Sequence, residues 1–279
     1  QKSCGIVPRS YNDRMSTSFD VCIRGDGMVG RSLALLLARQ HLRVALVGAP
    51  AAAAATAAAD VRAYSLNSAS RALLEELRCW PDDAHATAVQ HMRVWGDDGG
   101  FVHFDSPGSE GLTWIVDVPV LEQRLADAVG FTPAITRVAA PAPAALTVIC
   151  EGRHSATRAE LGVPFDALPY QQHAVAARLR ASVPHGGQAF QWFHQGPQGL
   201  EILALLPLGG VAGDTLGLVW SLPPTRAQAM LACDDAAFTD ALAQASQAAL
   251  GHFSLVSPRA MWPLRATRPT PSTRWRAWG

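Results

Sequence analysis

Charged residues are scarce in this chain: Asp, Glu, Lys and Arg make up 16% of its 279 residues, with 23 acidic and 23 basic side chains. Binding to nucleic acid through its phosphates requires an excess of Lys and Arg, so a net charge of zero argues against that class of protein. We therefore expect no nucleic-acid partner. A low content of charge in a chain of this length instead predicts a compact, apolar protein of one or two domains.

The patterns that mark disulfide frameworks, metal sites and membrane segments are also absent. The five cysteines form no C-x-x-C motif, and Cys22 and Cys150 lie in apolar strand-like runs, which predicts small buried thiols and a reducing compartment. The nine histidines have neither H-x-x-x-H nor H-E-x-x-H spacing, so we expect no metal site. No apolar run reaches the length of a membrane span, and residues 1–14 lack the apolar core of a secretory signal. We predict a cytoplasmic location.

What the sequence does contain is a stretch, residues 19–47, with the order strand, glycine turn, helix and strand. The turn, GDGMVG at positions 25–30, fits the G-x-G-x-x-G pattern between a β-prone run and an aliphatic helix. In such a unit the first glycine permits the tight turn, the second lets a pyrophosphate approach the backbone, and the third lets helix and strand pack closely. The free N–H groups at the helix start favour a phosphate there. We predict a dinucleotide site at Gly25, Gly27, Met28, Val29 and Gly30; the alternative is a glycine turn that binds no ligand.

The same stretch lacks one expected part, the acidic residue that accepts hydrogen bonds from the ribose at the end of the second strand. Gly48 stands at that position, and no carboxylate follows before Asp60. Asp26, inside the glycine turn, is expected to be solvated and to disfavour a pyrophosphate mildly. The phosphate end of the site is therefore predicted to be intact and the ribose end weak, and a glutamate at position 48 is expected to tighten binding.

The rest of the chain alternates between helical and strand patterns. Helices are expected at residues 68–77, 116–129 and 225–250. Two alternating runs, 91–95 and 101–104, flank a turn rich in Gly and Asp and predict a hairpin. A buried strand is expected at 145–150, after a loop at 133–143.

From residue 172 onward the pattern is rich in strands. They are expected at residues 173–179, 189–194, 201–206, 216–222, 253–256 and 261–264. Turns rich in Gly, Pro and Asp separate most of them, as in an antiparallel sheet. We therefore predict an α/β fold in which a nucleotide-binding domain is combined with a second, antiparallel-sheet domain.

Three further stretches matter in combination with the glycine turn. They are DVRAYSLNSASRALLEELRCWP from position 60, MRVWGDDGG from position 92 and CEGRHSATRAELGVPF from position 150. The last matches D-G-x-x-S-x-x-R, with Glu151 in place of the aspartate, followed by Gly152, Ser155 and Arg158. Taken in this order, the stretches resemble the flavoprotein aromatic hydroxylases, the class A monooxygenases with the p-hydroxybenzoate hydroxylase fold, and among them the ubiquinone-biosynthesis branch. No single motif is specific, but the combination is.

The resemblance implies a Rossmann-type FAD-binding domain with an interleaved antiparallel-sheet substrate domain. It implies that FAD is held by Gly25, Gly27, Met28, Val29, Gly30, Arg62, Glu151, Gly152 and Arg158, and that no side chain acts as a catalytic nucleophile. It further implies an FAD-dependent monooxygenase that uses NAD(P)H and O2 to hydroxylate a phenolic or quinone-precursor ring in ubiquinone biosynthesis. The expected substrate is small, lipophilic and aromatic. The expected associations are peripheral contact with the inner membrane and with a ubiquinone-biosynthesis complex.

By the same resemblance, the FAD-binding domain covers residues 19–90 and 107–170, and the substrate domain covers residues 91–106 and 171–264. Residues 1–18 are expected to be a disordered or non-native extension. The final residues, 265–279, are expected to begin the last strand of the FAD-binding domain, which is truncated because the family's following Gly-Asp flavin motif is incomplete.

Several of these residues also have a simpler interpretation. Arg62 is alternatively a salt-bridging surface residue, Arg158 a surface charge at a helix, and Ser155 an N-cap. The tryptophans of the predicted sheet are expected to fill its core rather than to stack on a flavin; they are Trp192, Trp220 and Trp262.

Departures from the family pattern keep two other functions open. Gly48 replaces the ribose acid, Pro119 replaces an arginine and Glu151 replaces an aspartate. These departures favour a degenerate, non-catalytic relative that serves as a binding or scaffold subunit. An NAD(P)-dependent reductase without flavin is the third interpretation, but it leaves the stretch from Glu151 to Arg158 unexplained.

Overall fold

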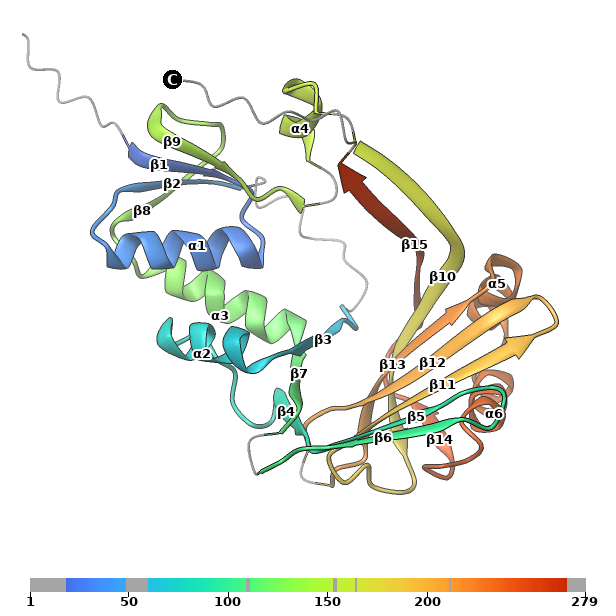
Figure 1. Ribbon diagram of the computed structural model, residues 1–279. Coiled ribbons are helices and arrows are strands. Elements are labelled where there is room, and N and C mark those ends of the chain that lie inside the picture. Colours follow the sequence, from blue (N-terminus) through green and yellow to red (C-terminus); the bar gives the residue numbers. More distant parts are fainter. Residues whose placement is uncertain are drawn as a thin grey trace, which may run out of the picture.

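The structure is a computed structural model that describes residues 19–48, 60–108, 111–152, 155–163, 165–210 and 212–269. The expected extension, residues 1–18, and the final residues, 270–279, lie outside the described part. Within that part, a small parallel sheet with its helices lies beside a large, mainly antiparallel sheet, and two long strands reach from one toward the other (Figure 1). No helix of the described residues is long and apolar enough to cross a bilayer.

A four-stranded parallel sheet in the order β8-β2-β1-β9 forms the N-terminal part. Its strands are β1 (Phe19–Arg24), β2 (Val44–Val47), β8 (Ile135–Val138) and β9 (Ala144–Ile149). Helices α1 (Met28–Arg39) and α3 (Val118–Gly130) lie on one face of this sheet, where Ile23, Leu46 and Leu125 are fully buried in a common core (Figure 1). The predicted order of strand, glycine turn, helix and strand is confirmed.

Two predictions for this sheet are wrong. The expected loop at 133–143 contains β8, which pairs with β2 in parallel register. Strand β9 is not buried as expected, since Leu146 is 57% and Ile149 is 42% exposed. The physical reason is that β9 lies at the edge of the sheet and pairs only with β1 among the described residues.

A second sheet is antiparallel and has three strands in the order β3-β7-β4. Its strands are β3 (Ala63–Leu66), β4 (Ala86–Val89) and β7 (Thr113–Asp117). The helix expected at 68–77 is confirmed as α2 (Ser68–Glu76), whose N-terminus is capped by the Asn67 side chain. Helix α3 begins two residues later than expected, because residues 116 and 117 still pair in β7 and Pro119 suits the first turn of a helix.

The large sheet has eight strands and the order β14-β10-β13-β12-β11-β5-β6, with β15 paired to β10. Its strands are β5 (His91–Trp95), β6 (Phe101–Asp105), β10 (Phe165–Ala181), β11 (Gln188–Gly196), β12 (Gly199–Pro207), β13 (Thr215–Leu222), β14 (Phe253–Leu255) and β15 (Ala260–Pro269). The predicted hairpin is confirmed as β5 and β6, and it joins the large sheet because β5 pairs with β11. The predicted antiparallel strands after residue 172 are confirmed, and so is the α/β fold class with a parallel and an antiparallel sheet.

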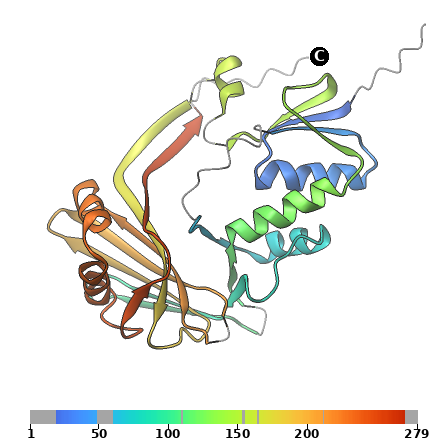
Figure 2. The ribbon, with the colours of Figure 1, turned by 180° about the vertical axis from the view of Figure 1, so that it is seen from behind.

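Helices α5 (Pro224–Ala232) and α6 (Asp235–Ala245) cover the outer face of the large sheet (Figure 1, Figure 2). The expectation of one helix over 225–250 is wrong. Cys233 has an extended backbone, and Asp234 caps α6 by accepting a hydrogen bond of 2.7 Å from the Ala237 amide. A capping aspartate competes with helix continuation, which explains the break.

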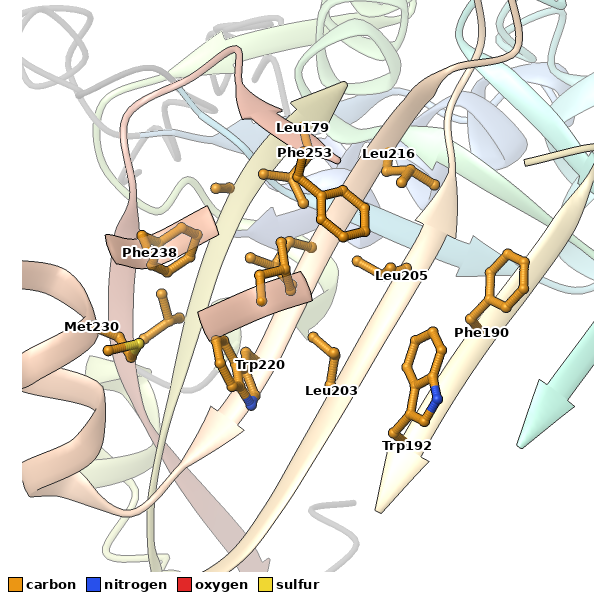
Figure 3. Close-up of a cluster of buried hydrophobic side chains, with 14 of the residues drawn as sticks. Leu179, Phe190, Trp192, Leu203, Leu205, Leu216, Trp220, Met230, Phe238 and Phe253 are labelled. Atoms are coloured by element: carbon orange, nitrogen blue, oxygen red, sulfur yellow. The ribbon is translucent and has the colours of Figure 1, made fainter. Parts of the chain in front are cut away.

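The core of the large sheet lies between its strands and these two helices. Figure 3 shows Trp192, Trp220 and Phe238 in this core together with leucines of β10, β12 and β13. Trp192 and Trp220 are 4% and 1% exposed, so their predicted role in the core is confirmed. The opposite, inner face of the sheet is turned toward the N-terminal part (Figure 2).

An ion pair ties the large sheet to the N-terminal part. Arg178 of β10 donates two hydrogen bonds, of 2.7 and 2.9 Å, to the two carboxylate oxygens of Asp117 at the start of α3. Both side chains are largely buried, and the bond to Asp117 raises the pKa of Arg178 above its usual value. A bidentate pair of this kind fixes orientation as well as distance, so it helps to hold the two sheets at a set spacing.

Candidate functional site

The glycine turn connects β1 to α1 at the carboxyl end of the small sheet. Gly25 has φ +112°, and a Cβ there would lie 2.5 Å from the backbone oxygen of Cys150. A Cβ on Gly30 would lie 1.9 Å from the backbone oxygen of Gly25. Both glycines are therefore required by the fold itself, in the roles predicted for the first and third glycines of the motif.

Gly27 differs from the other two because a Cβ there would meet no atom of the described residues within 4 Å. It is the N-cap residue of α1, and no side chain caps the helix. The first hydrogen bond of α1 runs from the Arg31 amide to the Gly27 oxygen, so the amides of Met28, Val29 and Gly30 precede the hydrogen-bonded turns. Open space in front of such amides is suited to a phosphate. Among the described residues nothing requires glycine at position 27, so a ligand would explain such a requirement.

The carboxylate of Asp26 lies beside Gly48, the position at which the ribose acid is missing. Gly48 directly follows β2, and a Cβ built on it would be 2.5 Å from Oδ2 of Asp26. The same Oδ2 lies 3.6 Å from a terminal nitrogen of Arg31, so Asp26 is ion-paired as well as partly exposed, which corrects the expectation that it is merely solvated. A glutamate at position 48 would displace this carboxylate and add a like charge beside it. The expected gain from that substitution is therefore replaced by an expected loss.

Glu151 follows β9 and is surrounded by donors. Its Oε1 accepts hydrogen bonds from Nε of Arg24 (3.1 Å) and the Thr157 hydroxyl (2.6 Å). Its Oε2 accepts from the Ser155 hydroxyl (2.7 Å) and the Thr157 amide (3.0 Å). These bonds, the one from the Thr157 hydroxyl above all, lower the pKa of Glu151 to about 2. Because four donors within the protein already engage both oxygens, we interpret Glu151 as a residue that positions its loop.

The loop that Glu151 positions leads into α4 (Ala156–Glu160). Ser155 caps α4 by accepting a hydrogen bond of 3.2 Å from the Arg158 amide, so its interpretation as an N-cap is confirmed. Arg24 pairs with Glu160 at 2.9 Å as well as with Glu151, and thereby fastens α4 to the end of β1. Arg158 lies in α4 and is partly buried. Its predicted contact with a cofactor stays a prediction.

Neutralising Glu151 is expected to loosen this loop. Glu151→Gln should lower the free energy of unfolding by about 1.5–3 kcal/mol, the range for hydrogen bonds to a charged group. The pKa of Glu151 is depressed in the folded state, so the stabilisation is complete above its usual value and is lost as the pH falls toward about 2. Urea unfolding of both proteins from about pH 7 to about pH 2.5 should therefore show a difference that shrinks only below about pH 4.5.

The matched control is Glu75→Gln, which breaks an exposed pair with Arg71 on α2 and should cost about 0.5 kcal/mol or less. A loss for Glu151→Gln as small as that of the control, or one independent of pH, would contradict the role given to Glu151.

Arg62 lines a cavity of about 660 Å³ beside the inner face of the large sheet. The lining residues are Val61, Arg62, Ala63, Tyr64, Gly152, Ala176, Leu206, Gly217, Leu218, Val219 and Trp262. The cavity therefore joins Arg62 and Gly152, two residues predicted from separate motifs, and its volume is typical of a small-molecule site. Trp262 was expected in the sheet core but lies in the wall of this cavity instead.

The guanidinium of Arg62 is held by two carboxylates. One terminal nitrogen lies 2.6 Å from Asp60 and 3.2 Å from Glu122, and the hydrogen bonds that Arg62 donates to Asp60 raise the pKa of Arg62 above its usual value. The backbone oxygen of Glu122 also accepts a hydrogen bond of 2.9 Å from Arg31. Glu122 thus bridges the cavity wall and the arginine that pairs with Asp26 in the glycine turn. The alternative interpretation of Arg62 as a salt-bridging residue is confirmed, and the cavity position is additional.

Sequence reasoning missed the residues that hold these parts together. They are Arg24, Arg31, Asp60, Glu122 and Thr157. None belongs to a motif with its own spacing, and their partners lie up to 136 positions away in the chain. Met28 and Val29, in contrast, were predicted, but their side chains line a separate apolar groove of about 410 Å³ beside α2 and α3. Only their backbone amides are placed to meet a phosphate.

Two curated proteins with similar sequences are named for ubiquinone hydroxylation or biosynthesis. The ubiquinone hydroxylase UbiL of Rhodospirillum rubrum is 27% identical over 72% of this chain and 51% of its own length. The mitochondrial ubiquinone biosynthesis monooxygenase COQ6 of Mus musculus is 25% identical over 86% of this chain and 58% of its own length. The predicted resemblance to the FAD-dependent aromatic hydroxylases is confirmed. No protein-family model matches the chain.

Solved structures share the fold of this chain. The p-nitrophenol 4-monooxygenase PnpA of Pseudomonas putida superposes with a TM-score of 0.63, with 14% sequence identity, over 92% of this chain and 70% of that protein. At this identity the likeness establishes the fold alone. The chain spans between 51% and 64% of the length of four curated relatives that it matches.

Proposed function

We propose that this chain binds FAD and takes part in the NAD(P)H- and O2-dependent hydroxylation of a lipophilic phenolic or quinone-precursor ring. The observation that carries the proposal is the position of Gly27. Gly27 leaves open space before the first amides of α1. Arg31 and Arg62 both bond to Glu122, and together they connect this space to the cavity that Arg62 and Gly152 line. Relatives named for ubiquinone hydroxylation support the ring chemistry.

The residues present fit a dinucleotide at three points. The amides of Met28, Val29 and Gly30 would bind the pyrophosphate, with Gly27 providing the close approach. The carboxylate of Asp26 would accept the ribose hydrogen bonds, since it occupies the place beside Gly48 at the end of β2. FAD, when bound, supplies the redox chemistry of the reaction, which no side chain of this chain can supply.

The cavity would then receive the ring. Its wall is mostly apolar, with Leu206, Val219 and Trp262 on the large sheet, and such a wall excludes water from the reacting ring. Apart from the indole N–H of Trp262, the polar side chains of the wall are Arg62 and Tyr64. A terminal nitrogen of Arg62 lies 3.4 Å from the hydroxyl oxygen of Tyr64. They would orient the oxygen substituent of the ring. Ubiquinone biosynthesis, peripheral contact with the inner membrane and membership of a biosynthetic complex belong to the same proposal.

A cavity-filling variant tests this assignment. With FAD and NADPH supplied, a lipophilic phenol should stimulate NADPH consumption by the protein and give a hydroxylated product. Val219→Trp should remove the stimulation because the indole fills the cavity, while FAD affinity stays the same. Val163→Trp, outside the cavity lining, is the matched control and should behave like the wild type. Product formation that is undiminished in Val219→Trp would contradict the proposed substrate site.

A non-catalytic binding role is the second candidate, and the engagement of Glu151 favours it, because that carboxylate has no oxygen left for a cofactor. Under this alternative the protein would form a stable complex with a complete hydroxylase in the absence of FAD. Size-exclusion chromatography of a mixture with an FAD-free hydroxylase of the ubiquinone branch distinguishes the two: co-elution without any FAD binding by this chain favours the scaffold role.

A further inference from the structure

The hairpin of β5 and β6 brings two histidines and an aspartate together at the edge of the large sheet. The register places His91 opposite Asp105 and Arg93 opposite His103. Nδ1 of His91 lies 2.5 Å, and Nε2 of His103 lies 3.0 Å, from the same oxygen, Oδ1 of Asp105. All three ligand atoms lie within 4.8 Å of one another. The sequence spacing of the histidines indicated no metal site because this cluster is assembled across two strands.

We propose that His91, His103 and Asp105 form a zinc site that links the edge strand β6 to β5. Two imidazole nitrogens and one carboxylate oxygen are ligands that zinc prefers, with water as the fourth ligand. A tetrahedral ion with bonds of about 2.1 Å holds its ligand atoms about 3.4 Å apart. The two histidine nitrogens lie 2.5 and 3.0 Å from the aspartate oxygen, so the three side chains have to separate slightly to admit the ion. The side chains are 43%, 37% and 57% exposed, which leaves a path for the ion from solvent.

The site is separate from the proposed flavin site. His91, Arg93 and Trp95 alternate onto one face of β5, and Trp95 stacks on Trp192 at a ring distance of 4.9 Å in the core under α5 and α6. Met92 points to the other face and packs near Leu206, which lines the cavity with Arg62. The zinc site therefore lies on the outer face of the sheet, and its test does not depend on FAD binding.

One neighbouring side chain, Arg93, disfavours cation binding at this site and therefore provides a test. Arg93 lies on the same face as the three ligands, directly across from His103. Its positive charge repels a divalent cation at this distance. Removing the charge should therefore tighten zinc binding, whereas a merely structural role of the hairpin residues gives no reason for such a gain.

Another His–Asp pair of the chain provides a matched control. Nδ1 of His85 lies 2.5 Å from Asp82, and the two side chains are 39% and 57% exposed, which closely matches His91 and Asp105. This pair lacks a second histidine, and Arg124 lies 3.3 Å from its aspartate. His85→Gln should therefore leave zinc affinity unchanged.

Isothermal titration of the full chain with zinc chloride tests the proposal, with magnesium chloride as the control ion. We expect one zinc ion per chain and no magnesium. His103→Gln and Asp105→Asn should each raise the Kd for zinc at least about tenfold, Arg93→Gln should lower it, and His85→Gln should not change it. Circular dichroism checks that each variant is folded. The assignment would be overturned if the wild type bound no zinc, or if His103→Gln bound zinc as strongly as the wild type. It would also be overturned if His85→Gln weakened zinc binding as much as His103→Gln does.

Discussion

Gly27→Val is expected to abolish FAD binding while leaving the fold intact. A Cβ at position 27 meets no atom of the described residues within 4 Å, so the described part of the fold has room for the side chain. The same side chain would fill the space before the amides of Met28 and Val29, where the pyrophosphate is proposed to lie. Fluorescence titration of FAD with the variant should show no saturable quenching. Its urea unfolding curve should stay within about 1 kcal/mol of the wild type.

Gly30→Ala is the matched contrast, because it adds an even smaller side chain to the same motif. Its Cβ would lie 1.9 Å from the backbone oxygen of Gly25, so the turn or the helix must shift. We expect a loss of about 3 kcal/mol or more in unfolding free energy, at the upper end of the usual cost of overpacking. Equal stability of Gly30→Ala and wild type would contradict the packing of the turn. FAD binding by Gly27→Val that equals that of the wild type would contradict the proposed phosphate site.

Asp26→Asn is expected to weaken FAD binding by about 1.5–3 kcal/mol, which corresponds to an increase in Kd of about 10-fold to 150-fold. The reason is that Asp26 occupies the place at the end of β2 from which a carboxylate receives the ribose hydroxyls. Gly48→Glu should also weaken binding, because the new side chain displaces the Asp26 carboxylate and repels it. The double variant Asp26→Gly with Gly48→Glu should regain most of the wild-type affinity, since one carboxylate then stands in the usual position.

A double-mutant cycle of Asp26→Gly, Gly48→Glu and the double variant measures the coupling between the two positions. Asp20→Asn serves as a control for the general effect of charge, since Asp20 pairs with Arg43 at the other end of β1. Tighter FAD binding by Gly48→Glu alone would show that Asp26 does not fill the ribose position. An unchanged Kd in Asp26→Asn would show the same.

The parts of the fold that could be predicted from sequence depend on neighbours along the chain. The glycine turn and its helix follow from residues 25–39, where one pattern of glycines is followed by one aliphatic run. The hairpin of β5 and β6 follows from two alternating runs around a Gly-rich turn. Strand β8 was missed because its four residues lie among alanines and prolines, and only pairing with β2 makes them a strand.

The candidate site could be predicted only in part for the same reason. The motif glycines, Arg62 and Gly152 carry local signals, whereas the position of Asp26 beside Gly48 depends on the two parallel strands ending side by side. Glu122 joins Arg62 and Arg31 across 60 and 91 positions, and no spacing rule reports such contacts. The hydrogen-bond donors of Glu151 could not be predicted, because they include Arg24, which lies at the end of another strand. The predicted contact of Glu151 with the cofactor stays a prediction.

The measurement that tests the central claim most directly is a fluorescence titration of FAD with the wild-type chain and with Gly27→Val. The account predicts saturable quenching with one FAD per chain for the wild type and none for the variant, with both proteins folded. The absence of saturable quenching by the wild type, or identical quenching by both proteins, would contradict the claim that the glycine turn holds the cofactor.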